Sequence, residues 1–401
     1  MSTLLNISDK IGLQSTPNPS LLNLYGGAAA AYSLRQLDYN YTGPAVTVRR
    51  DSDQATKDIG FVNGELDTAS LEAFTTEDYV RISSDYSGAT PDPSAATNSL
   101  TVESNQSALG VSEALKCTVT GSSPYFYLSG FGGSGIELNI SFDYYIPSGQ
   151  SLGSIRVGVA SPEETFSTTG EWATANFNQT SSYSFVIFRA NTNVIGDEFY
   201  VKNLVVTQTS ANGFVTTWYD QSGNGNDATQ GTASAQPKIV SLGSTILENG
   251  KATLEFDGTR VFNSSINLTA EQSAIAVATK STSQAYLTSD DLNHHAIVSG
   301  FINGFESFDG PRFTITSNPT NTIGIVSQFI SSTFASFYNQ TANATGTTTY
   351  TSATTIKTIG GYEISGFRYN GKISELVLYS SDERTNQSGI YTNINDFYSI
   401  Y

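Results

Sequence analysis

The side chains of this sequence that could do chemistry are a few carboxylates, a histidine pair and some aromatic residues. Glu306 and Asp309 lie close together, and a retaining glycosidase needs two carboxylates about 5–5.5 Å apart. Acidic residues in a loop of an acidic chain are more often solvated, so we predict that these two are not catalytic. His294 and His295 are adjacent, so on a strand they would point to opposite faces and could not share a metal ion. We predict no catalytic residue, no metal and no cofactor.

A second candidate is the loop in Trp218-Tyr-Asp-Gln-Ser-Gly-Asn-Gly-Asn-Asp-Ala228. Asp220, Asn224, Asn226 and Asp227 present oxygen atoms at short intervals, as a calcium loop does. The spacing is not that of an EF-hand, and no Glu stands at its twelfth position. Asp and Asn side chains also bond to their own backbone in tight turns, and glycines permit positive φ there. A self-bonded turn is our prediction, with a calcium site as the alternative.

Aromatic side chains could instead stack on sugar rings. Our candidates are Trp172, Tyr125, Tyr127 and Tyr145. Tyr145 falls on the polar side of an alternating segment, and Trp172 lies in a polar context that predicts a loop. Most aromatic residues of a β-sandwich belong to its core, so these four define a carbohydrate-binding hypothesis rather than a site.

The segments that must position these residues are mostly strands. Between residues 76 and 211, apolar and polar residues alternate with a period of two, which predicts a jelly roll of short antiparallel strands. Its legible strands are 138–146, 155–160, 183–188 and 199–206, and the glycine-rich stretch 130–135 predicts a flexible hairpin. After residue 212 we expect further strands at 214–219, 252–256, 274–279, 311–316, 323–328 and 373–379.

Helices are few in this prediction. The alanine-rich segment 27–37 predicts a short helix, and 67–74 a single helical turn with Asp67 as its N-cap. A last helix should begin with a Ser380/Glu383 capping box or at Thr385. Its apolar face is formed by Ile390, Tyr391, Ile394 and Phe397. Residues 1–24 read as a polar arm.

Composition limits the class of protein. The chain has 401 residues, a net charge of −17 and only 14% charged residues. Such a surface repels nucleic acid and anionic lipid, so we expect neither as a partner. The chain has one cysteine, no apolar run of the roughly 20 residues that span a bilayer, and a start unlike a signal peptide. Together these features predict synthesis in a reducing cytosol and no insertion into a membrane.

Seven segments of the sequence carry motifs of one known family: 31–37, 43–53, 58–60, 66–69, 218–228, 236–240 and 254–258. In these segments the chain resembles the catalytic-domain family of B-type α-L-arabinofuranosidases. This resemblance implies a concanavalin- or laminin-G-like β-sandwich. The stretch 196–206 resembles the last strand of carbohydrate-binding-module jelly rolls. We therefore predict an all-β chain with an arm at 1–24, a sandwich formed by 25–75 and 212–401, and an inserted jelly roll at 76–211. The tail 359–379, with the helix predicted after it, resembles the closing strand and helix of laminin-G-like domains.

The segments that resemble this family do not include its catalytic residues. In the arabinofuranosidases the nucleophilic Glu follows adjacent cysteines, which this chain lacks. Sandwiches of this kind with an inserted jelly roll are similar to bacteriophage structural proteins. We therefore predict a non-catalytic virion protein, a head or tail fibre or decoration subunit. Its expected partners are other virion proteins, copies of itself (as a trimer in a fibre) and host-surface glycans. The alternatives are an arabinofuranosidase-type glycoside hydrolase and a bacterial surface adhesin.

Overall fold

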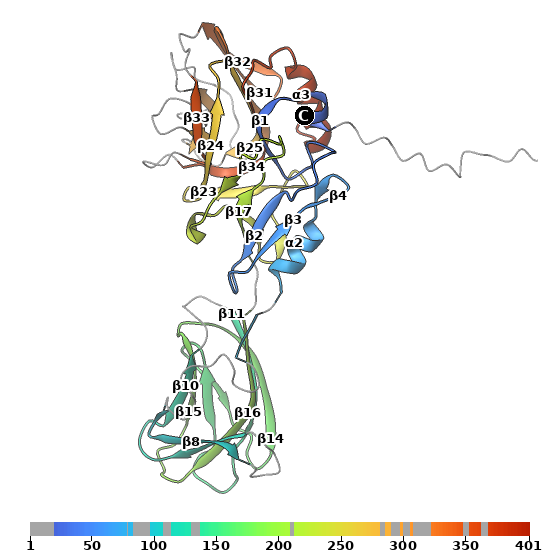
Figure 1. Cartoon of the computed structure of the whole chain (residues 1–401). Coiled ribbons are helices and arrows are strands. Elements are labelled where there is room, and N and C mark those ends of the chain that lie inside the picture. Colours follow the sequence, from blue (N-terminus) through green and yellow to red (C-terminus); the bar gives the residue numbers. More distant parts are fainter. Residues whose placement is uncertain are drawn as a thin grey trace, which may run out of the picture. The chain divides into compact units, whose positions relative to one another are not determined.

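The protein is all-β, and its described residues divide into two compact units (Figure 1). The computed structural model describes residues 20–77, 79–82, 97–106, 114–129, 137–208, 212–280, 285–289, 297–299, 305–307, 322–347, 353–361 and 368–401. One unit combines Met1–Thr75 with Ala211–Tyr401 and is called the host sandwich below. The other, Thr76–Ser210, is called the insert. The sequence prediction placed the insert at 76–211.

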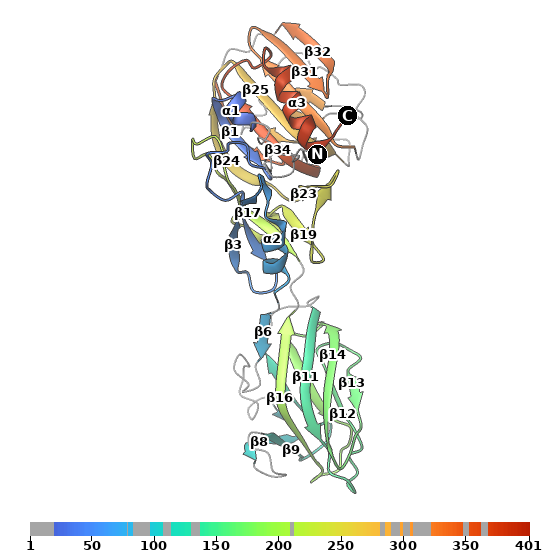
Figure 2. The ribbon, with the colours of Figure 1, turned by 90° about the vertical axis from the view of Figure 1, so that its right-hand side faces the viewer.

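The insert is built from two antiparallel sheets (Figure 2). The β11 sheet has the strand order β14-β11-β16-β9-β8, with β6 also paired to β16. The β15 sheet has the order β13-β12-β15-β10-β7. The strands are β6 (Tyr79–Ile82), β7 (Thr97–Asn98), β8 (Leu100–Gln106), β9 (Ala114–Val119), β10 (Tyr125–Ser129), β11 (Glu137–Tyr145), β12 (Ile155–Gly158), β13 (Glu164–Phe166), β14 (Trp172–Thr180), β15 (Phe185–Ala190) and β16 (Glu198–Gln208).

The apolar residues that alternate with polar ones in the sequence form the core of the insert. In β11, Leu138, Ile140, Phe142 and Tyr144 are buried, while the residues between them are more exposed. They pack with Phe126, Val186 and Phe188 of the other sheet into one core. Because successive side chains of a strand point to opposite faces, the remaining residues form the two outer faces of the insert.

The host sandwich is an extended antiparallel sheet that folds over its own core. Its main path runs β27-β33-β24-β18-β17-β19-β23-β34-β25-β30-β31-β32. Its strands are β1 (Ala28–Ser33), β2 (Val46–Arg50), β3 (Thr56–Ile59), β4 (Phe61–Val62), β5 (Glu65–Leu66), β17 (Gly213–Trp218), β18 (Ala228–Thr229), β19 (Lys238–Ser241), β20 (Ser244–Thr245), β21 (Leu247–Glu248), β22 (Lys251–Ala252), β23 (Leu254–Asp257), β24 (Phe262–Leu268), β25 (Gln272–Lys280), β26 (Ala285–Tyr286), β27 (Thr288–Ser289), β28 (Ile297–Ser299), β29 (Phe305–Ser307), β30 (Gly324–Ile330), β31 (Thr333–Tyr338), β32 (Thr341–Thr347), β33 (Thr354–Ile359) and β34 (Asn370–Tyr379).

Helices cover part of this sheet. The helices are α1 (Leu21–Leu24), α2 (Thr68–Thr75), the 3₁₀ turn η3 (Ala233–Ala235) and α3 (Gln387–Tyr398). Side chains of α1 and α3 pack against β1, β25, β30 and β34 in a cluster separate from the sandwich core. Strand β34 contributes Leu376 to the core and Val377 to the helical side. It is therefore buried on both faces from Ile373 to Tyr379, and its last four residues are all apolar.

Several predicted elements are wrong. Residues 28–33 form strand β1 instead of a helix, because they pair with β34 and this tertiary pairing overrides the helix propensity of alanine. The predicted arm ends earlier than residue 24, since α1 packs onto the body with Leu21 fully buried. Trp172 begins strand β14 and does not lie in a loop. The last helix begins after Asn386, so the predicted Ser380/Glu383 capping box does not start it.

Other predictions hold. Asp67 caps α2, because its Oδ1 accepts a hydrogen bond from the backbone N–H of Ser70 at 3.0 Å. Ile390, Tyr391 and Ile394 of α3 are buried together. The predicted strand at 311–316 and hairpin at 130–135 lie outside the described residues. Within the part of the chain that the structure describes, every helix is too short or too polar to span a membrane.

Candidate functional site

The loop after β17 is held by its own polar side chains. Asp220 is 4% exposed, and its two carboxylate oxygens accept four hydrogen bonds. The donors are the backbone N–H groups of Ala31 (2.8 Å), Ser222 (2.9 Å) and Asn226 (3.0 Å), and the Ser222 hydroxyl (2.8 Å). Gly223 and Gly225 have φ values of 86° and 71°, as a tight turn requires.

The same loop fastens strand β1 to the rest of the host sandwich. Asn224 and Asn226 donate to the carbonyl oxygen of Ala29 at 3.2 and 2.8 Å. Gln221 is 2% exposed and bonds Ser33, Arg35 and Leu37 through its side-chain amide. The predicted self-bonded turn is thus present, but half of its partners lie about 190 residues earlier in the chain. Among the described residues, no group of three or more His, Cys, Asp or Glu side chains is placed to hold a metal ion.

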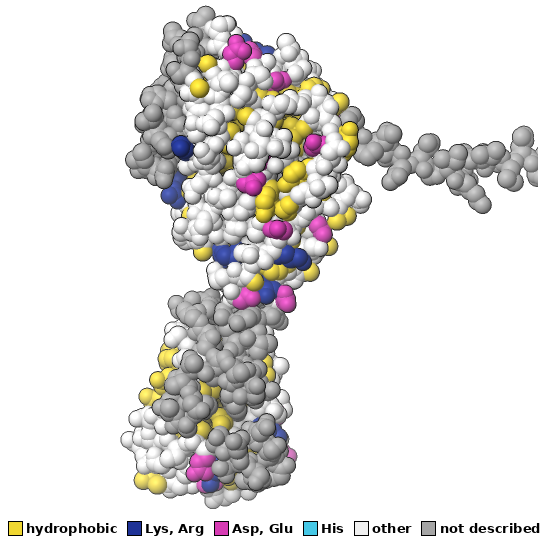
Figure 3. Space-filling model, in the orientation of Figure 1, with side chains coloured by type: hydrophobic (Ala, Val, Ile, Leu, Met, Phe, Trp, Pro, Cys, Tyr) yellow, Lys and Arg dark blue, Asp and Glu magenta, His cyan; other side chains and the backbone are white. Residues whose placement is uncertain are grey.

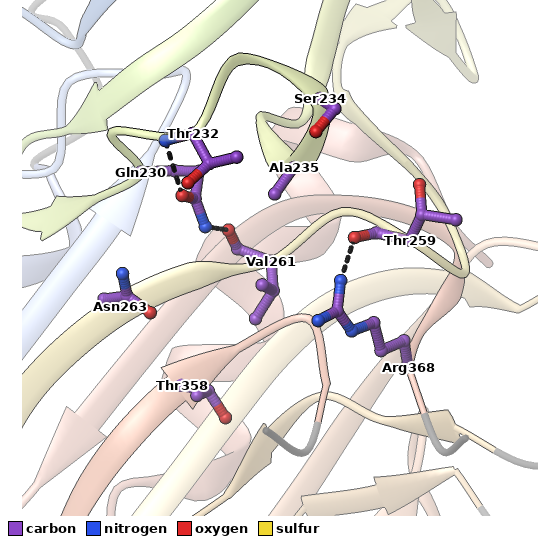
Figure 4. A pocket seen from close by; sticks show the side chains of 9 residues that line it. All are labelled: Gln230, Thr232, Ser234, Ala235, Thr259, Val261, Asn263, Thr358 and Arg368. Atoms are coloured by element: carbon purple, nitrogen blue, oxygen red, sulfur yellow. Dashed lines mark hydrogen bonds between the residues drawn. The ribbon is translucent and has the colours of Figure 1, made fainter. Parts of the chain in front are cut away.

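A pocket of about 580 Å³ opens in the host sandwich (Figure 4). Gln230 and Arg368 lie on opposite sides of it. Gln230 Nε2 donates to the Val261 carbonyl at 2.7 Å, and Arg368 donates to the Thr259 carbonyl. None of the described residues that line this pocket is Asp or Glu. The described part of its lining therefore holds no carboxylate pair of the kind that glycoside hydrolysis needs.

A second host pocket, of about 300 Å³, does contain two carboxylates, Glu248 and Glu255. Both oxygens of Glu248 already have partners: Oε2 pairs with Lys372 Nζ at 2.6 Å, and Oε1 accepts from Thr279 Oγ1 at 3.2 Å. Of the predicted acidic pair, Glu306 lies in β29 opposite Val298 of β28. The Glu306 side chain, Asp309, His294 and His295 lie outside the described residues.

The insert presents a row of aromatic side chains on the outer face of the β11 sheet. Trp172, Tyr145 and Tyr200 are directly opposite one another on β14, β11 and β16. The ring of Tyr145 lies 5.7 Å from that of Trp172 and 6.0 Å from that of Tyr200. Tyr145 and Trp172 are half-buried, and Tyr200 is 6% exposed. We call these three residues the aromatic platform.

Charged groups fix the platform in place. Lys202 Nζ lies 4.2 Å from the centre of the Trp172 ring, within cation–π distance. The Tyr200 hydroxyl donates to Glu198 at 3.0 Å, and Lys116 pairs with the same carboxylate at 2.8 Å. Burial, together with that bond to Glu198, raises the pKa of Tyr200. The hydrogen bond to Glu198 raises the pKa of Lys116. Both groups therefore keep their protons at neutral pH.

A row of amides and hydroxyls continues the same outer face. Asn139 Nδ2 donates to Asn176 Oδ1 and to Asn178 Oδ1, both at 2.8 Å. Within the described residues, the exposed side-chain amides of Asn176 and Asn178 are recorded only as acceptors, so their N–H groups remain as donors. Asp143 accepts from Thr174 Oγ1 and Asn203 Nδ2 at 2.7 Å each. The face thus combines flat aromatic surface with fixed hydrogen-bonding groups.

The four aromatic residues predicted from the sequence do not form one site. Tyr145 and Trp172 share the platform, whereas Tyr125 and Tyr127 lie in β10, on the outer face of the other sheet. Arg189 lies over the Tyr125 ring, 5.0 Å from its centre. Tyr127 packs against Phe185, and Phe185 stacks on Tyr183. The prediction missed Tyr200, although its position between the buried Phe199 and Val201 indicates an outward side chain.

On the face of the host sandwich that Figure 3 shows, Asp and Glu side chains lie mostly apart from one another. The net charge of −17 is therefore not gathered into one acidic site on that face.

Comparisons with known proteins give only distant similarities. No family model matches the chain, and no curated protein matches its sequence. The chain is similar to the structure of an arabinofuranosidase complexed with arabinofuranosyl-α-1,2-xylobiose, with 12% identity and a TM-score of 0.47 over 92% of this chain and 62% of that one. A GH54 α-L-arabinofuranosidase soaked with a cyclic sulfate inhibitor aligns at 11% identity and a TM-score of 0.45, over the same shares of the two chains.

A family 29 carbohydrate-binding module complexed with mannohexaose aligns at 18% identity, over 33% of this chain and 91% of the module, with a TM-score of 0.25. The chain spans 62% of the length of the two arabinofuranosidases. At these scores the similarities support no inference about activity or ligand, so function is inferred below from the described residues.

Proposed function

We propose that this chain is a carbohydrate-binding protein and that the insert binds glycans through its aromatic platform. The observation that carries the proposal is the alignment of Trp172, Tyr145 and Tyr200 across three adjacent strands, on the outer face of a sheet. An aromatic residue in a sandwich normally serves the core, and the core of the insert is complete without these three rings. Half-buried aromatic rings on an outer face mark interaction surfaces.

The neighbouring groups suit a sugar. A carbohydrate offers apolar C–H faces and a rim of hydroxyls, so it needs flat apolar surface next to hydrogen-bonding groups of both kinds. The platform supplies the surface, and the amides of Asn176 and Asn178 supply donors beside it. Asp143 supplies an acceptor that Thr174 and Asn203 already hold in position. Since these groups are fixed by one another, little side-chain entropy is lost on binding.

The test is a glycan array, followed by calorimetry on the best ligand. Trp172→Ala should weaken binding about tenfold or more, as truncation of a central aromatic contact does. The matched control is Tyr183→Ala, which removes an aromatic ring from the outer face of the β15 sheet. It should bind the same glycan as the unchanged protein does. Array binding that Trp172→Ala leaves intact would refute the platform as the site.

The second candidate is an arabinofuranosidase-type hydrolase, favoured by the presence of Glu248 and Glu255 in one pocket. We propose that the chain is not catalytic, since Lys372 and Thr279 bond both oxygens of Glu248. Turnover of an aryl arabinofuranoside that is abolished by Glu255→Gln or Glu306→Gln would overturn this proposal. No turnover at micromolar protein over a day would agree with it.

We further propose that the protein is a subunit of a bacteriophage virion. As part of a fibre or as a decoration protein, it would adhere to glycans on the host surface. The support is the sequence: an acidic surface, one cysteine and a composition rich in Ser, Thr, Asn and Gly. A virion subunit should co-purify with intact particles in stoichiometric amounts, and the isolated protein should be oligomeric by light scattering. A protein found only outside purified particles would contradict the proposal.

A further inference from the structure

The insert has a pocket that the proposed glycan site does not use. Its volume is about 310 Å³, and it lies on the β15 sheet, on the side of the insert away from the platform. Arg156 of β12 and Arg189 of β15 line it, and the loop 191–193 and the turn at Ser123 supply further polar groups. A pocket of this size holds a small molecule such as a monosaccharide.

The two arginines are direct cross-strand partners. Like charges in this position repel each other and destabilise a sheet unless an anion lies between them. Glu163 supplies one carboxylate to both: its Oε1 accepts from Arg189 Nε at 3.0 Å, and its Oε2 lies 3.4 Å from Arg156 Nη1. Among the described residues no other acidic side chain pairs with either arginine. The pocket therefore carries a net positive charge in a chain whose net charge is −17.

Both guanidinium groups have donors left for a ligand. Arg189 contacts Glu163 through Nε, and no bond of its two terminal nitrogens to a described residue is recorded. Arg156 donates to Glu163 through Nη1 at 3.4 Å, and among the described residues its Nη2 has no acceptor. The Arg156 side chain is 43% exposed, so its terminal group is open to a ligand.

The pocket wall is held rigid before any ligand binds. Arg189 stacks over the Tyr125 ring, 5.0 Å from its centre. Asn193 Oδ1 accepts from the backbone N–H of Ser123 at 3.0 Å, and Asn191 Nδ2 donates to Ser154 Oγ at 3.1 Å. These bonds tie the loop after β15 to the turns before β10 and β12, so binding needs little reorganisation.

We propose that this pocket binds the carboxylate of an acidic sugar, such as a uronic acid. Planar guanidinium groups match the geometry of a carboxylate and can donate paired hydrogen bonds to it. The amides and hydroxyls of Asn191, Thr192 and Asn193 suit the ring hydroxyls of a sugar. An inorganic anion would satisfy the charge but would leave most of the volume and the neutral polar lining without contacts. The insert would then bind two kinds of glycan, one on each outer face.

The test is titration of the full chain with galacturonate, with galactose as its neutral counterpart and with inorganic phosphate. Galacturonate should bind at least tenfold more tightly than either, and its affinity should fall as salt is raised. Arg156→Gln should weaken galacturonate binding at least tenfold and leave the fold intact, because the Arg189–Glu163 pair remains. The matched control, Lys357→Gln, removes one positive charge from strand β33 of the host sandwich and should leave galacturonate binding unchanged.

If Arg156→Gln does not fold, Arg189→Lys serves instead: it keeps the charge, loses the planar fork and should weaken galacturonate several-fold. Galactose binding equal to galacturonate, phosphate binding equal to galacturonate, or no effect of these variants would each overturn the proposal. The outcome is separable from the platform, because Trp172→Ala should leave galacturonate binding unchanged and Arg156→Gln should leave binding of the platform's glycan unchanged.

Discussion

The host sandwich and the insert use the same residue types in opposite ways. In the host, Tyr32 and Trp218 are fully buried with rings 5.5 Å apart, and Asp220 bonds only to neighbouring protein groups. In the insert, Tyr145 and Trp172 lie at a comparable ring distance of 5.7 Å on an outer face. Asp143 there is held beside them at the surface.

The cause of this difference is what covers each sheet. Part of the host sheet is covered by α1 and α3, so side chains on both faces of β34 are buried. The described residues of the insert include no helix, so no described helix covers the outer face of either sheet. A sheet without such cover needs polar outer faces for solubility, so aromatic rings on them call for another explanation. Under the proposed function, polar side chains therefore contribute stability in the host and recognition in the insert.

The largest effect on stability is expected at the buried ion pair Arg35–Glu375 of the host sandwich. Glu375 is 1% exposed and binds Arg35 through two bonds of 2.7 and 2.9 Å. Glu375→Leu would leave the Arg35 charge uncompensated and should lower the free energy of unfolding of the host by about 3–5 kcal/mol. Denaturant unfolding followed by Trp218 fluorescence in a Trp172→Phe background measures it. The double variant Arg35→Met/Glu375→Leu should recover much of the loss. A loss below about 1 kcal/mol would show that the pair is not structural.

The Asp220 loop should show the next largest effect. Asp220→Ala removes the acceptor of four hydrogen bonds and should cost the host about 2–4 kcal/mol, by the same fluorescence measurement. Asn224→Ala, an exposed change in the same loop, should cost about 1 kcal/mol. Platform glycan binding should be unchanged in both variants. A chelator that lowers the host midpoint as much as Asp220→Ala does would favour the calcium alternative.

The smallest effect concerns the ion pair between Arg50 and Asp53, whose side chains are 10% and 15% exposed. Arg50 donates to both oxygens of Asp53 at 2.7 and 2.8 Å, and these bonds hold the pKa of Asp53 at about 2. An unfolded Asp titrates near 3.9, so the pair stabilises the fold above about pH 4, and this contribution is lost as pH falls toward 2. Asp53→Asn should remove that part of the acid dependence, worth about 2 kcal/mol. An unchanged pH profile between 4 and 2 would contradict this assignment.

The strands could largely be predicted from the sequence, because alternation in segments such as 138–146 reports directly on which side is buried. The sequence prediction failed where residues far away in the chain determine the local structure. Ala28–Ser33 is a strand only because β34 pairs with it, and the Ala31 N–H that Asp220 accepts lies 189 residues away. Two of the three platform residues, Tyr145 and Trp172, were candidates from the sequence alone. The arginine pocket was not visible, because only the pairing of β12 with β15 brings Arg156 beside Arg189.

The host residues on either side of the insertion lie close together in the fold. Both host ends of the insertion are pinned together: a side chain at Gly213 would meet Thr75 Cγ2 at 2.8 Å, and Asn212 Nδ2 donates to Asp51 at 2.7 Å. These contacts lie within the host sandwich itself and hold residues 75 and 213, on either side of the insertion, close together. Under the proposed function, exchange of the insert at these two neighbouring points would change the glycan that is bound while the host sandwich stayed the same.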